Sequence, residues 1–343
     1  MGILITTTPI KTTARQNRGR GRENMAIEGS RVLITGGAGF IGSYVAEALG
    51  DKCDVLVLDN LSSGKKKFID DLIKHHGVSF AKADILKDSI DQFLKDRDAV
   101  IHLATNPDVR SGIKQPSIHF ESDVLGTHRL LEAMRSSQVK TILFTSTSTV
   151  YGEPKVIPTP EDYGPLIPIS PYGGTKLAAE ALIASYAKMN NWRAIMFRFA
   201  NVVGGRSTHG VTFDLINKLR KNPKRLEILG RYPGTMKSYV HVTDVVAGLI
   251  SAWKKAGEQV DYFNIGSEDM MSVEDIAKIV VEEMGLKDVK FDWEGGVDDG
   301  RGWAGDVKKM FLSIEKLKRT GWRPQYKSAE AVRLAARATL GNP

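Results

Sequence analysis

The chain has 343 residues, of which 42 % are apolar and 26 % charged, so it can bury a core large enough for two domains. Its single cysteine, Cys53, excludes an internal disulfide and is typical of a protein of the reducing cytoplasm. No apolar run approaches the roughly 18 residues that a membrane-spanning helix requires, which argues against a membrane protein.

The net charge of +8 is concentrated at the start of the chain. Residues 1–24 contain five basic side chains and one acidic side chain, which is half of the net charge, and they show no hydrophobic periodicity. We expect residues 1–28 to form a disordered basic extension, most of it upstream of a functional start at Met25. The alternatives are a transit peptide and a basic arm that binds nucleic acid. The nucleic-acid alternative is less favoured, because the rest of the chain carries only a modest net charge.

From residue 30 onward, short apolar strands alternate with helical patterns. This alternation predicts an α/β fold with a Rossmann-type doubly wound parallel sheet and helices on both faces. The predicted strands are 32–34, 54–58, 78–83, 99–104, 141–146, 193–199 and 262–265. The predicted helices are 44–49, 124–137, 174–189, 212–220, 242–254, 271–284, 312–320 and 329–340.

After residue 201 the strands become short and the loops rich in Gly, Arg and Pro. The change predicts a smaller C-terminal α/β domain that binds the substrate. Because an apolar strand returns at 262–265, we expect the two domains to be interleaved. The nucleotide-binding domain would comprise residues 29–200 and 238–266, and the substrate domain residues 201–237 and 267–343.

The first strand leads into a glycine-rich turn that predicts a dinucleotide site. Gly36, Gly39 and Gly42 fall at the spacing GxxGxxG, between that strand and the next helix. Such glycines provide a tight turn, close approach of backbone N–H groups to a pyrophosphate, and close packing of helix on strand. The positive end of the helix dipole adds attraction for the anion.

An acid at the end of the second strand indicates which dinucleotide binds. Asp59 lies about 20 residues beyond the glycines, where a carboxylate accepts both ribose hydroxyls of an adenosine and repels a 2′-phosphate. The sequence therefore favours NAD over NADP. Lys65, Lys66 and Lys67 nearby favour the opposite choice, but we interpret them as the solvated face of a helix.

Tyr172 and Lys176 form a YxxxK motif at the start of a predicted helix, which places a phenol and an ammonium group on one helical face. A free tyrosine has a pKa of about 10, so a catalytic base near pH 7 needs that pKa to fall by roughly 3 units. Lys176 and the positive nicotinamide ring can share this task. Thr147, at the end of the preceding strand, can donate to the same substrate oxygen.

Further segments follow a recognisable pattern. They are TGGAGFIG at 35–42, DNLSSG at 59–64, ADI at 83–85, HLA at 102–104, TSTSTVYG at 145–152, PYGGTK at 171–176, NVVGGR at 201–206, KSYVHVTD at 237–244 and FNIGS at 263–267. From about Arg31 to Trp322 the chain therefore resembles the extended short-chain dehydrogenases/reductases of the NAD-dependent nucleotide-sugar epimerase/dehydratase family.

The resemblance implies a role for each matched residue. The catalytic residues would be Thr147, Tyr172 and Lys176. The NAD contacts would be Gly36, Gly39, Phe40, Ile41, Gly42, Asp59, Asn60, Ser63, Gly64, Asp84, Ile85, Leu103, Ala104, Thr145, Tyr172 and Lys176. The nucleotide sugar would be bound by Thr147, Asn201, Arg206, Lys237 and Arg301. No spacing of His, Cys or carboxylate residues predicts a metal site.

The residues after Thr147 separate the activities within the family. The 4,6-dehydratases resemble TDEVYG and the sugar-acid decarboxylases TSEVYG, whereas this chain has Ser148 and Thr149 in those places. No carboxylate remains there to protonate a leaving hydroxyl. A small residue followed by Thr is typical of UDP-glucose 4-epimerases. The predicted reaction is therefore epimerisation of a nucleotide sugar, in the first instance a UDP-hexose, at C4 through a transient 4-keto intermediate.

Some departures leave the sugar open. Lys237 stands where epimerases usually place arginine, which turns a bidentate phosphate clamp into a point charge. The segment 303–306 replaces a frequent RPGD, so that Arg301 is the nearest arginine. Pro107 replaces a lysine found in some epimerases, and Asp123 stands where asparagine is common.

Other interpretations of the same chain remain. A net dehydrogenase or reductase, a dehydratase or a decarboxylase would share the fold, and a non-catalytic member could bind RNA through the basic extension. Family members often form homodimers through a four-helix bundle, to which helices 124–137 and 174–189 would contribute. The apolar periodicity of these helices equally permits burial within one subunit. We expect a cytoplasmic homodimer.

Overall fold

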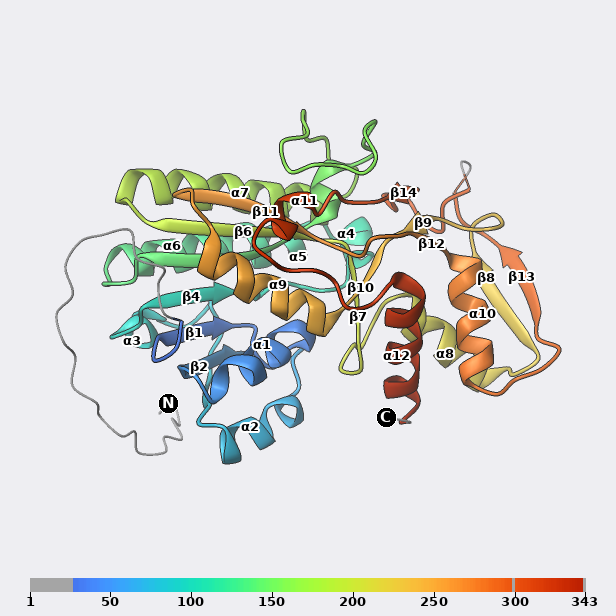
Figure 1. The fold of residues 1–343 in the computed structure, drawn as a ribbon, viewed down its shortest axis with the longest axis horizontal. Coiled ribbons are helices and arrows are strands. Elements are labelled where there is room, and N and C mark those ends of the chain that lie inside the picture. Colours follow the sequence, from blue (N-terminus) through green and yellow to red (C-terminus); the bar gives the residue numbers. More distant parts are fainter. Residues whose placement is uncertain (1–26, 298–299, 342–343) are drawn as a thin grey trace.

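Seven parallel strands form the central sheet, and helices cover both of its faces (Figure 1). The computed structural model describes residues 27–297 and 300–341, so nearly all of the predicted extension lies outside the described residues. The strands are β1 (Arg31–Thr35), β2 (Asp54–Asp59), β3 (Ser79–Lys82), β4 (Ala99–His102), β5 (Thr141–Thr147), β6 (Arg193–Phe199) and β11 (Val260–Ile265). Within the described ranges, no helix is long and apolar enough to cross a membrane.

The strand order is β3-β2-β1-β4-β5-β6-β11, and every neighbouring pair is parallel. This is the Rossmann order, so the predicted fold class is confirmed. The order reverses between β1 and β4. In open α/β sheets, ligands bind in the crevice at such a reversal, outside the carboxyl ends of the strands.

The two faces of the sheet have separate apolar cores. On one face, α1 (Phe40–Gly50) and α9 (Val242–Lys255) bury side chains such as Val45 and Leu249. On the other, α6 (Gly126–Arg135) and α7 (Pro171–Asn190) bury Leu130 among others. Because both faces are covered, β5 is buried at all 7 positions.

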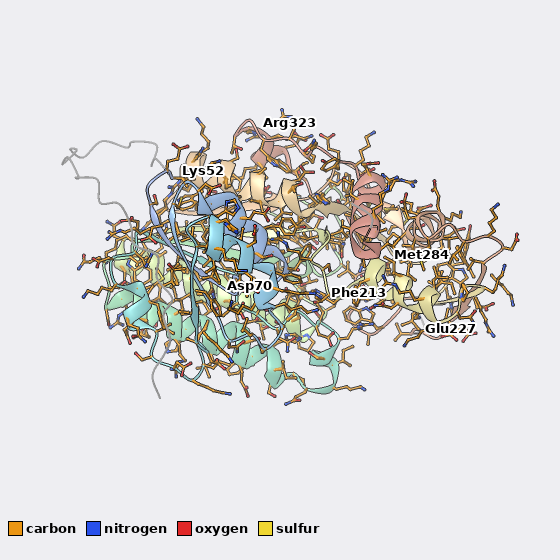
Figure 2. All side chains as sticks on the ribbon, turned by 90° about the horizontal axis from the view of Figure 1, so that it is seen from below. Lys52, Asp70, Phe213, Glu227, Met284 and Arg323 are labelled. Carbon is orange, nitrogen blue, oxygen red and sulfur yellow. The ribbon has the colours of Figure 1, made fainter. Side chains whose placement is uncertain are left out.

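A third core lies at the other end of the molecule. It is enclosed by α8 (Val211–Lys221), α10 (Val273–Glu283), α12 (Ser328–Leu340) and the parallel pair β8 (Arg225–Leu229) and β13 (Lys290–Glu294). Figure 2 shows Glu227 and Met284 at this end, away from Lys52 and Asp70 at the end that holds the central sheet.

Short strands join the two ends of the molecule. They are β7 (Asn201–Val203), β9 (Met236–Lys237), β10 (Tyr239–His241), β12 (Met271–Ser272) and β14 (Lys309–Met310). The chain crosses between the ends more than once, because α9 and β11 belong to the first core and α10 to the third. Residues 307–322, which include α11 (Glu315–Lys318), pack on the first core.

Some element boundaries differ from the prediction for identifiable reasons. The predicted helix 124–137 is two segments, a π-helix η2 (Phe120–Leu125) followed by α6. The predicted helix 271–284 starts at Val273, because the two preceding residues pair with β9. Ser272 and Asp275 then form a capping box that fixes its start. The predicted helix 312–320 is reduced to α11.

Short elements without periodicity escaped prediction. They are α3 (Asp91–Leu94), α4 (Ser111–Lys114), α5 (Ser117–His119), η3 (Ser148–Tyr151), β8 and β13. Each of these helices spans at most 4 residues, which is too short for a helical repeat to show in the sequence. The helix expected at Lys65, Lys66 and Lys67 is the turn η1 (Lys66–Phe68), followed by α2 (Asp70–His75).

A buried ion pair joins β6 to α7. The Arg198 guanidinium donates to both Glu180 carboxylate oxygens, at 3.1 and 2.8 Å, and Ser146 donates to the same carboxylate at 2.5 Å. Both charged side chains are at most 5 % exposed. The Arg198 guanidinium also stacks on Tyr151 and Tyr262, 4.9 and 4.8 Å from the ring centroids. This pair holds α7, which carries the predicted catalytic residues Tyr172 and Lys176, against the sheet.

We predict that Arg198→Leu lowers the free energy of unfolding by about 3–5 kcal/mol, because it leaves the Glu180 carboxylate buried without a counter-charge. The control is Arg135→Ala, which removes an exposed ion pair with Glu132 at 3.4 Å and should cost less than about 1 kcal/mol. Urea denaturation of both variants measures the difference. Equal losses in the two variants would contradict this assignment.

Candidate active site

The turn after β1 is shaped by glycines that no larger residue could replace. Gly36 has φ +71°, and a Cβ on it would lie 2.7 Å from the backbone nitrogen of Ala104, at the end of β4. A Cβ on Gly42 would lie 2.3 Å from the Gly36 carbonyl oxygen. Gly39 precedes α1, and no side chain caps the helix. The turn therefore presents backbone N–H groups at the strand reversal, as an anion site requires.

The predicted ribose carboxylate faces this turn from the end of β2. Asp59 is buried and accepts the N–H groups of Ala38, at 3.0 Å, and Leu61, at 2.8 Å. Burial raises the pKa of Asp59. A Cβ on Gly64 would lie 2.8 Å from both carboxylate oxygens, so this glycine keeps the approach open.

The remaining predicted adenosine contacts lie beside Asp59. Asn60 donates to Asp84 at 3.2 Å, which links the ends of β2 and β3. Asp84 also accepts the N–H of Leu86 at 2.9 Å. The fold therefore gathers the glycine turn, Asp59, Asn60 and Asp84 at one edge of the sheet, although they are spread over some fifty residues of sequence.

Local capping fixes the three predicted catalytic residues. Ser170 accepts the Gly173 N–H at 3.2 Å and so starts α7, which carries Tyr172 and Lys176. Thr147, at the end of β5, accepts both the N–H and the hydroxyl of Thr149, each at 3.2 Å. The Thr147 side chain also interacts with Tyr172, where it lowers the pKa of the phenol.

Lys176 is held against β5. Its side chain is 1 % exposed, its Nζ donates to the Thr145 carbonyl at 3.0 Å, and it lies 4.7 Å from the Phe144 ring centroid. Burial lowers the pKa of Lys176, which the charges of Asp123 and Glu180 oppose.

The surroundings of Tyr172 shift its pKa upward. Burial and then the negative charge of Asp123 raise the pKa of Tyr172, while the hydrogen bond from Thr147 lowers it. The Lys176 ammonium donates one of its three N–H groups to the Thr145 carbonyl. The direction of the shift is therefore opposite to the fall of roughly 3 units that the sequence argument required of a base.

The predicted substrate residues occupy two places. Lys237 pairs with Asp306, and Arg301 pairs with Glu153 at 3.3 Å, so these cations lie where β9 and the 300–306 loop meet. Asn201 donates from its side chain to the Ser238 carbonyl at 3.1 Å, between β7 and β10.

Arg206 is turned toward the nucleotide-binding end. Its guanidinium pairs with Glu47 at 2.5 Å and lies 4.3 Å from the ring centroid of Tyr44, and both residues belong to α1. Within residues 27–297 and 300–341, Arg206 forms its ion pair with Glu47, whereas Lys237 forms its ion pair with Asp306.

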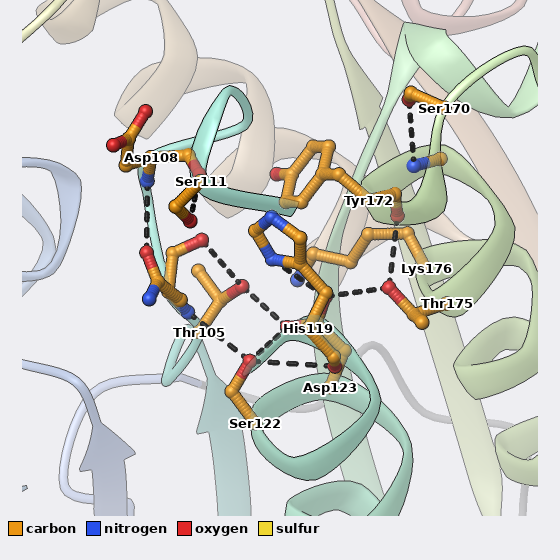
Figure 3. A network of polar contacts seen from close by, with 12 residues as sticks. Thr105, Asp108, Ser111, His119, Ser122, Asp123, Ser170, Tyr172, Thr175 and Lys176 are labelled. Atoms are coloured by element: carbon orange, nitrogen blue, oxygen red, sulfur yellow. Dashed lines mark hydrogen bonds and ion pairs between the residues drawn. The ribbon is translucent and has the colours of Figure 1, made fainter. Parts of the chain in front are cut away.

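Sequence reasoning missed a polar network beside Tyr172 (Figure 3). Asp123 is 1 % exposed and accepts hydroxyl protons from Thr105 at 2.5 Å, Ser122 at 3.2 Å and Thr175 at 2.9 Å. Buried His119 lies against the Tyr172 ring. The available signal was the spacing of four residues between His119 and Asp123, just before a glycine-led helix.

Comparison with known proteins agrees with this geometry. The model of the NAD dependent epimerase/dehydratase family matches residues 32–266. The chain belongs to this family. A UDP-glucose 4-epimerase of Halalkalibacterium halodurans is 32 % identical over 321 residues, which are 88 % of this chain and 92 % of that protein. The resemblance drawn from the motifs is thereby confirmed.

Solved members of the family have the same fold. A crystal structure of a UDP-galactose 4-epimerase has a TM-score of 0.81 and 41 % identity, and covers 91 % of this chain and 98 % of that one. A UDP-glucuronic acid 4-epimerase from Bacillus cereus, in complex with UDP-glucuronic acid and NAD, has a TM-score of 0.82 and 27 % identity, over 90 % of this chain and 99 % of that one. These relatives indicate a nucleotide-sugar 4-epimerase, and their names differ in the sugar.

His102 connects the site to the pH dependence of stability. It is completely buried, and its ring nitrogens lie 2.7 Å from the Thr35 hydroxyl and 3.1 Å from the Thr127 hydroxyl. Burial, with the charge of Lys176, lowers the pKa of His102 to about 3. The unfolded chain therefore binds a proton at higher pH than the folded protein does.

We predict that this family member loses stability as the pH falls from about 6.5 toward 3, with His102 contributing about 2 kcal/mol of the loss between pH 7 and pH 5. In His102→Asn, that part of the pH dependence should disappear. The exposed His75→Asn serves as the control and should keep the wild-type slope. Denaturant unfolding at pH 7 and pH 5 gives the change in the free energy of unfolding for each protein. An identical change in all three proteins would refute the assignment.

Proposed function

We propose that this chain is an NAD-dependent UDP-hexose 4-epimerase. The observation that carries the proposal is the end of β5, where Thr149 donates to Thr147 and the Thr147 side chain lowers the pKa of Tyr172. Ser148 and Thr149 occupy the positions where dehydratases and decarboxylases have carboxylates, so there is no acid at these positions to expel a sugar hydroxyl. The names of the relatives support the same reaction.

The residues present fit NAD. The glycine turn leaves a cradle that a Cβ on Gly36 or Gly42 would fill, and the Asp59 carboxylate lies beside it. We assign the pyrophosphate to residues 36–42, the adenosine to Asp59, Asn60, Ser63, Gly64, Asp84 and Ile85, and the nicotinamide side to Leu103, Ala104, Thr145, Tyr172 and Lys176. When bound, NAD supplies the acceptor, and then the donor, of the hydride at C4.

Tyr172 would act as the base. Its phenolate takes the proton of the C4 hydroxyl while Thr147 donates a hydrogen bond to the same oxygen. On the return of hydride to the other face of the 4-keto sugar, Tyr172 gives the proton back, so the protein ends unchanged. The positive charge introduced with the cofactor offsets the burial that otherwise keeps Tyr172 protonated.

The diphosphate of the substrate would lie at the second end of the molecule. Lys237 and Arg301 supply positive charge there, and Asn201 lies on β7 between the two ends. We therefore retain the division into a nucleotide-binding part, 29–200 with 238–266, and a substrate part, 201–237 with 267–343. Arg206 would reach the sugar nucleotide only by leaving Glu47.

A cytoplasmic homodimer completes the proposal. The helices α6 and α7 lie side by side on one face of the sheet (Figure 1). At the end of α7, Met189 is 86 % exposed, as a residue of an intersubunit contact would be in one subunit alone. The single cysteine is buried and fits a reducing compartment.

We expect the wild-type protein to interconvert UDP-glucose and UDP-galactose, or their N-acetyl or uronate forms, without net change in NADH absorbance. Tyr172→Phe should lower kcat about 10²–10⁴-fold, because the catalytic base is lost, while leaving the bound NAD in place. Product analysis over this panel is the measurement. Stoichiometric NADH would indicate a dehydrogenase, a 4-keto-6-deoxy product a dehydratase, and no conversion of any sugar would defeat the proposal.

We expect Gly42→Ala to weaken NAD binding at least tenfold, because the added Cβ would lie 2.3 Å from the Gly36 carbonyl oxygen and displace the turn. The matched control is Gly257→Ala. Gly257 is exposed, a Cβ on it would meet no atom within 4 Å, and the variant should keep the wild-type affinity. Titration with NAD followed by tryptophan fluorescence compares the two. If Gly42→Ala binds NAD with the wild-type affinity, the assignment of the NAD site to this turn is wrong.

A further inference from the structure

The helical segment before α6 contains a buried histidine beside the catalytic phenol. His119, at the end of α5, is 0 % exposed, and its ring centroid lies 5.3 Å from that of Tyr172 with the planes at 67°. In Figure 3 the imidazole lies between the Tyr172 ring and Asp123. The edge-to-face contact places the histidine in the wall of the site.

The polar atoms of this histidine are not satisfied by hydrogen bonds. Neither ring nitrogen has a hydrogen-bond partner within residues 27–297 and 300–341. The Nδ1 atom lies 4.0 Å from a carboxylate oxygen of Asp123, which is the distance of an ion pair. An unpaired buried polar group costs about 1–3 kcal/mol and an unpaired buried charge costs more, so the Asp123 carboxylate is the group on which a charged His119 would depend.

The surrounding backbone is adapted to the imidazole. A Cβ on Gly112 of α4 would lie 2.3 Å from the Cδ2 atom and 2.8 Å from the Nε2 atom of His119. Asp123 follows within the π-helix η2, a rare conformation that is frequent at functional sites. The histidine and the aspartate are thus placed together by two unusual local features.

Asp123 presents an electrostatic problem for catalysis. Its carboxylate is buried and lies in the same network as Tyr172, because Thr175 of α7 donates to it at 2.9 Å. A negative charge at this point opposes the formation of phenolate, and Asp123 is the second largest cause that raises the pKa of Tyr172. An asparagine amide at this position is uncharged and would not oppose the formation of the Tyr172 phenolate.

We propose that His119 and Asp123 act as one charged pair, in which a protonated His119 offsets the Asp123 carboxylate and thereby supports the ionisation of Tyr172. The inference rests on the proposed role of Tyr172 as the base. His119 is a positioning residue, since it keeps its proton throughout the cycle and the proton of the sugar goes to Tyr172.

The charges around the pair are compatible with this assignment. From α7 the pair meets Tyr172 and Lys176, and the Lys176 ammonium is directed to the Thr145 carbonyl. On the side of α4, Arg110 pairs with Asp108 and Asp214, at 3.9 and 3.4 Å, and Lys114 is exposed. The carboxylate at the shortest recorded distance from the imidazole is therefore Asp123, within the described part of the chain.

The test is the ionisation of Tyr172 in the NAD-loaded protein, without any sugar. Phenolate absorbance is titrated in the wild type, His119→Phe, His119→Gln, Asp123→Asn and the double variant His119→Phe/Asp123→Asn, each against the same protein carrying Tyr172→Phe. We expect the Tyr172 midpoint to rise by about one pH unit in both single histidine variants, and kcat at pH 7 to fall about tenfold with it. The double variant should return to within about twofold of wild-type kcat.

A purely structural role predicts a different pattern. His119→Phe keeps a ring of similar size against Tyr172. If His119 only packs, the ionisation midpoint of Tyr172 should stay at the wild-type value in His119→Phe and change only in His119→Gln. That pattern, or additive losses in the double variant, would overturn the proposal. If His119→Phe fails to bind NAD, the Tyr172 ionisation midpoint of His119→Gln tests the proposal instead. Failure of the wild type to convert any sugar would defeat the proposed function, but the Tyr172 midpoints could still be measured, because the titration uses no sugar.

Discussion

The contact between the turn after β1 and the end of β4 is the constraint on which the rest of the site depends. The two strands are neighbours only because the sheet order reverses between them, and Gly36 allows their ends to approach within a distance that any side chain would prevent. Through this approach, the glycine turn, the Asp59 carboxylate and the residues after β4 come to one edge of the sheet. A dinucleotide can then meet backbone N–H groups and a ribose acceptor together.

Buried charged side chains lie on α7 and on the neighbouring segment η2, and each of them has a defined hydrogen-bond or ion-pair partner. The Glu180–Arg198 pair anchors the middle of the helix to β6, Lys176 is held by a carbonyl of β5, and the Asp123 carboxylate is held by three hydroxyls. In low-dielectric surroundings such groups affect each other strongly. Burial and the Asp123 charge together raise the pKa of Tyr172. In the mechanism that we propose, the positive charge of the cofactor would offset this effect.

The second end of the molecule has its own apolar core and its own cations, so it can vary independently of the nucleotide site. Lys237 and Arg301 are both held by carboxylates, which fixes their orientation. The relatives with this fold are named for UDP-glucose, UDP-galactose and UDP-glucuronic acid. Under the proposed function, the choice among such sugars would depend on the residues at this end of the molecule.

Local pattern determined much of this protein from the sequence alone: the buried strands, the glycine turn, Asp59, and the Tyr172–Lys176 pair one helical turn apart. These signals are short in range, because a strand period, a turn or a helical spacing is visible within a few residues. Tertiary structure alone decided that His119 lies against Tyr172, that Arg206 faces α1, and that residues 307–322 return to the first core. Such contacts join residues up to hundreds of positions apart, and they depend on which surfaces remain to be buried after the sheet has formed. No local periodicity records that outcome.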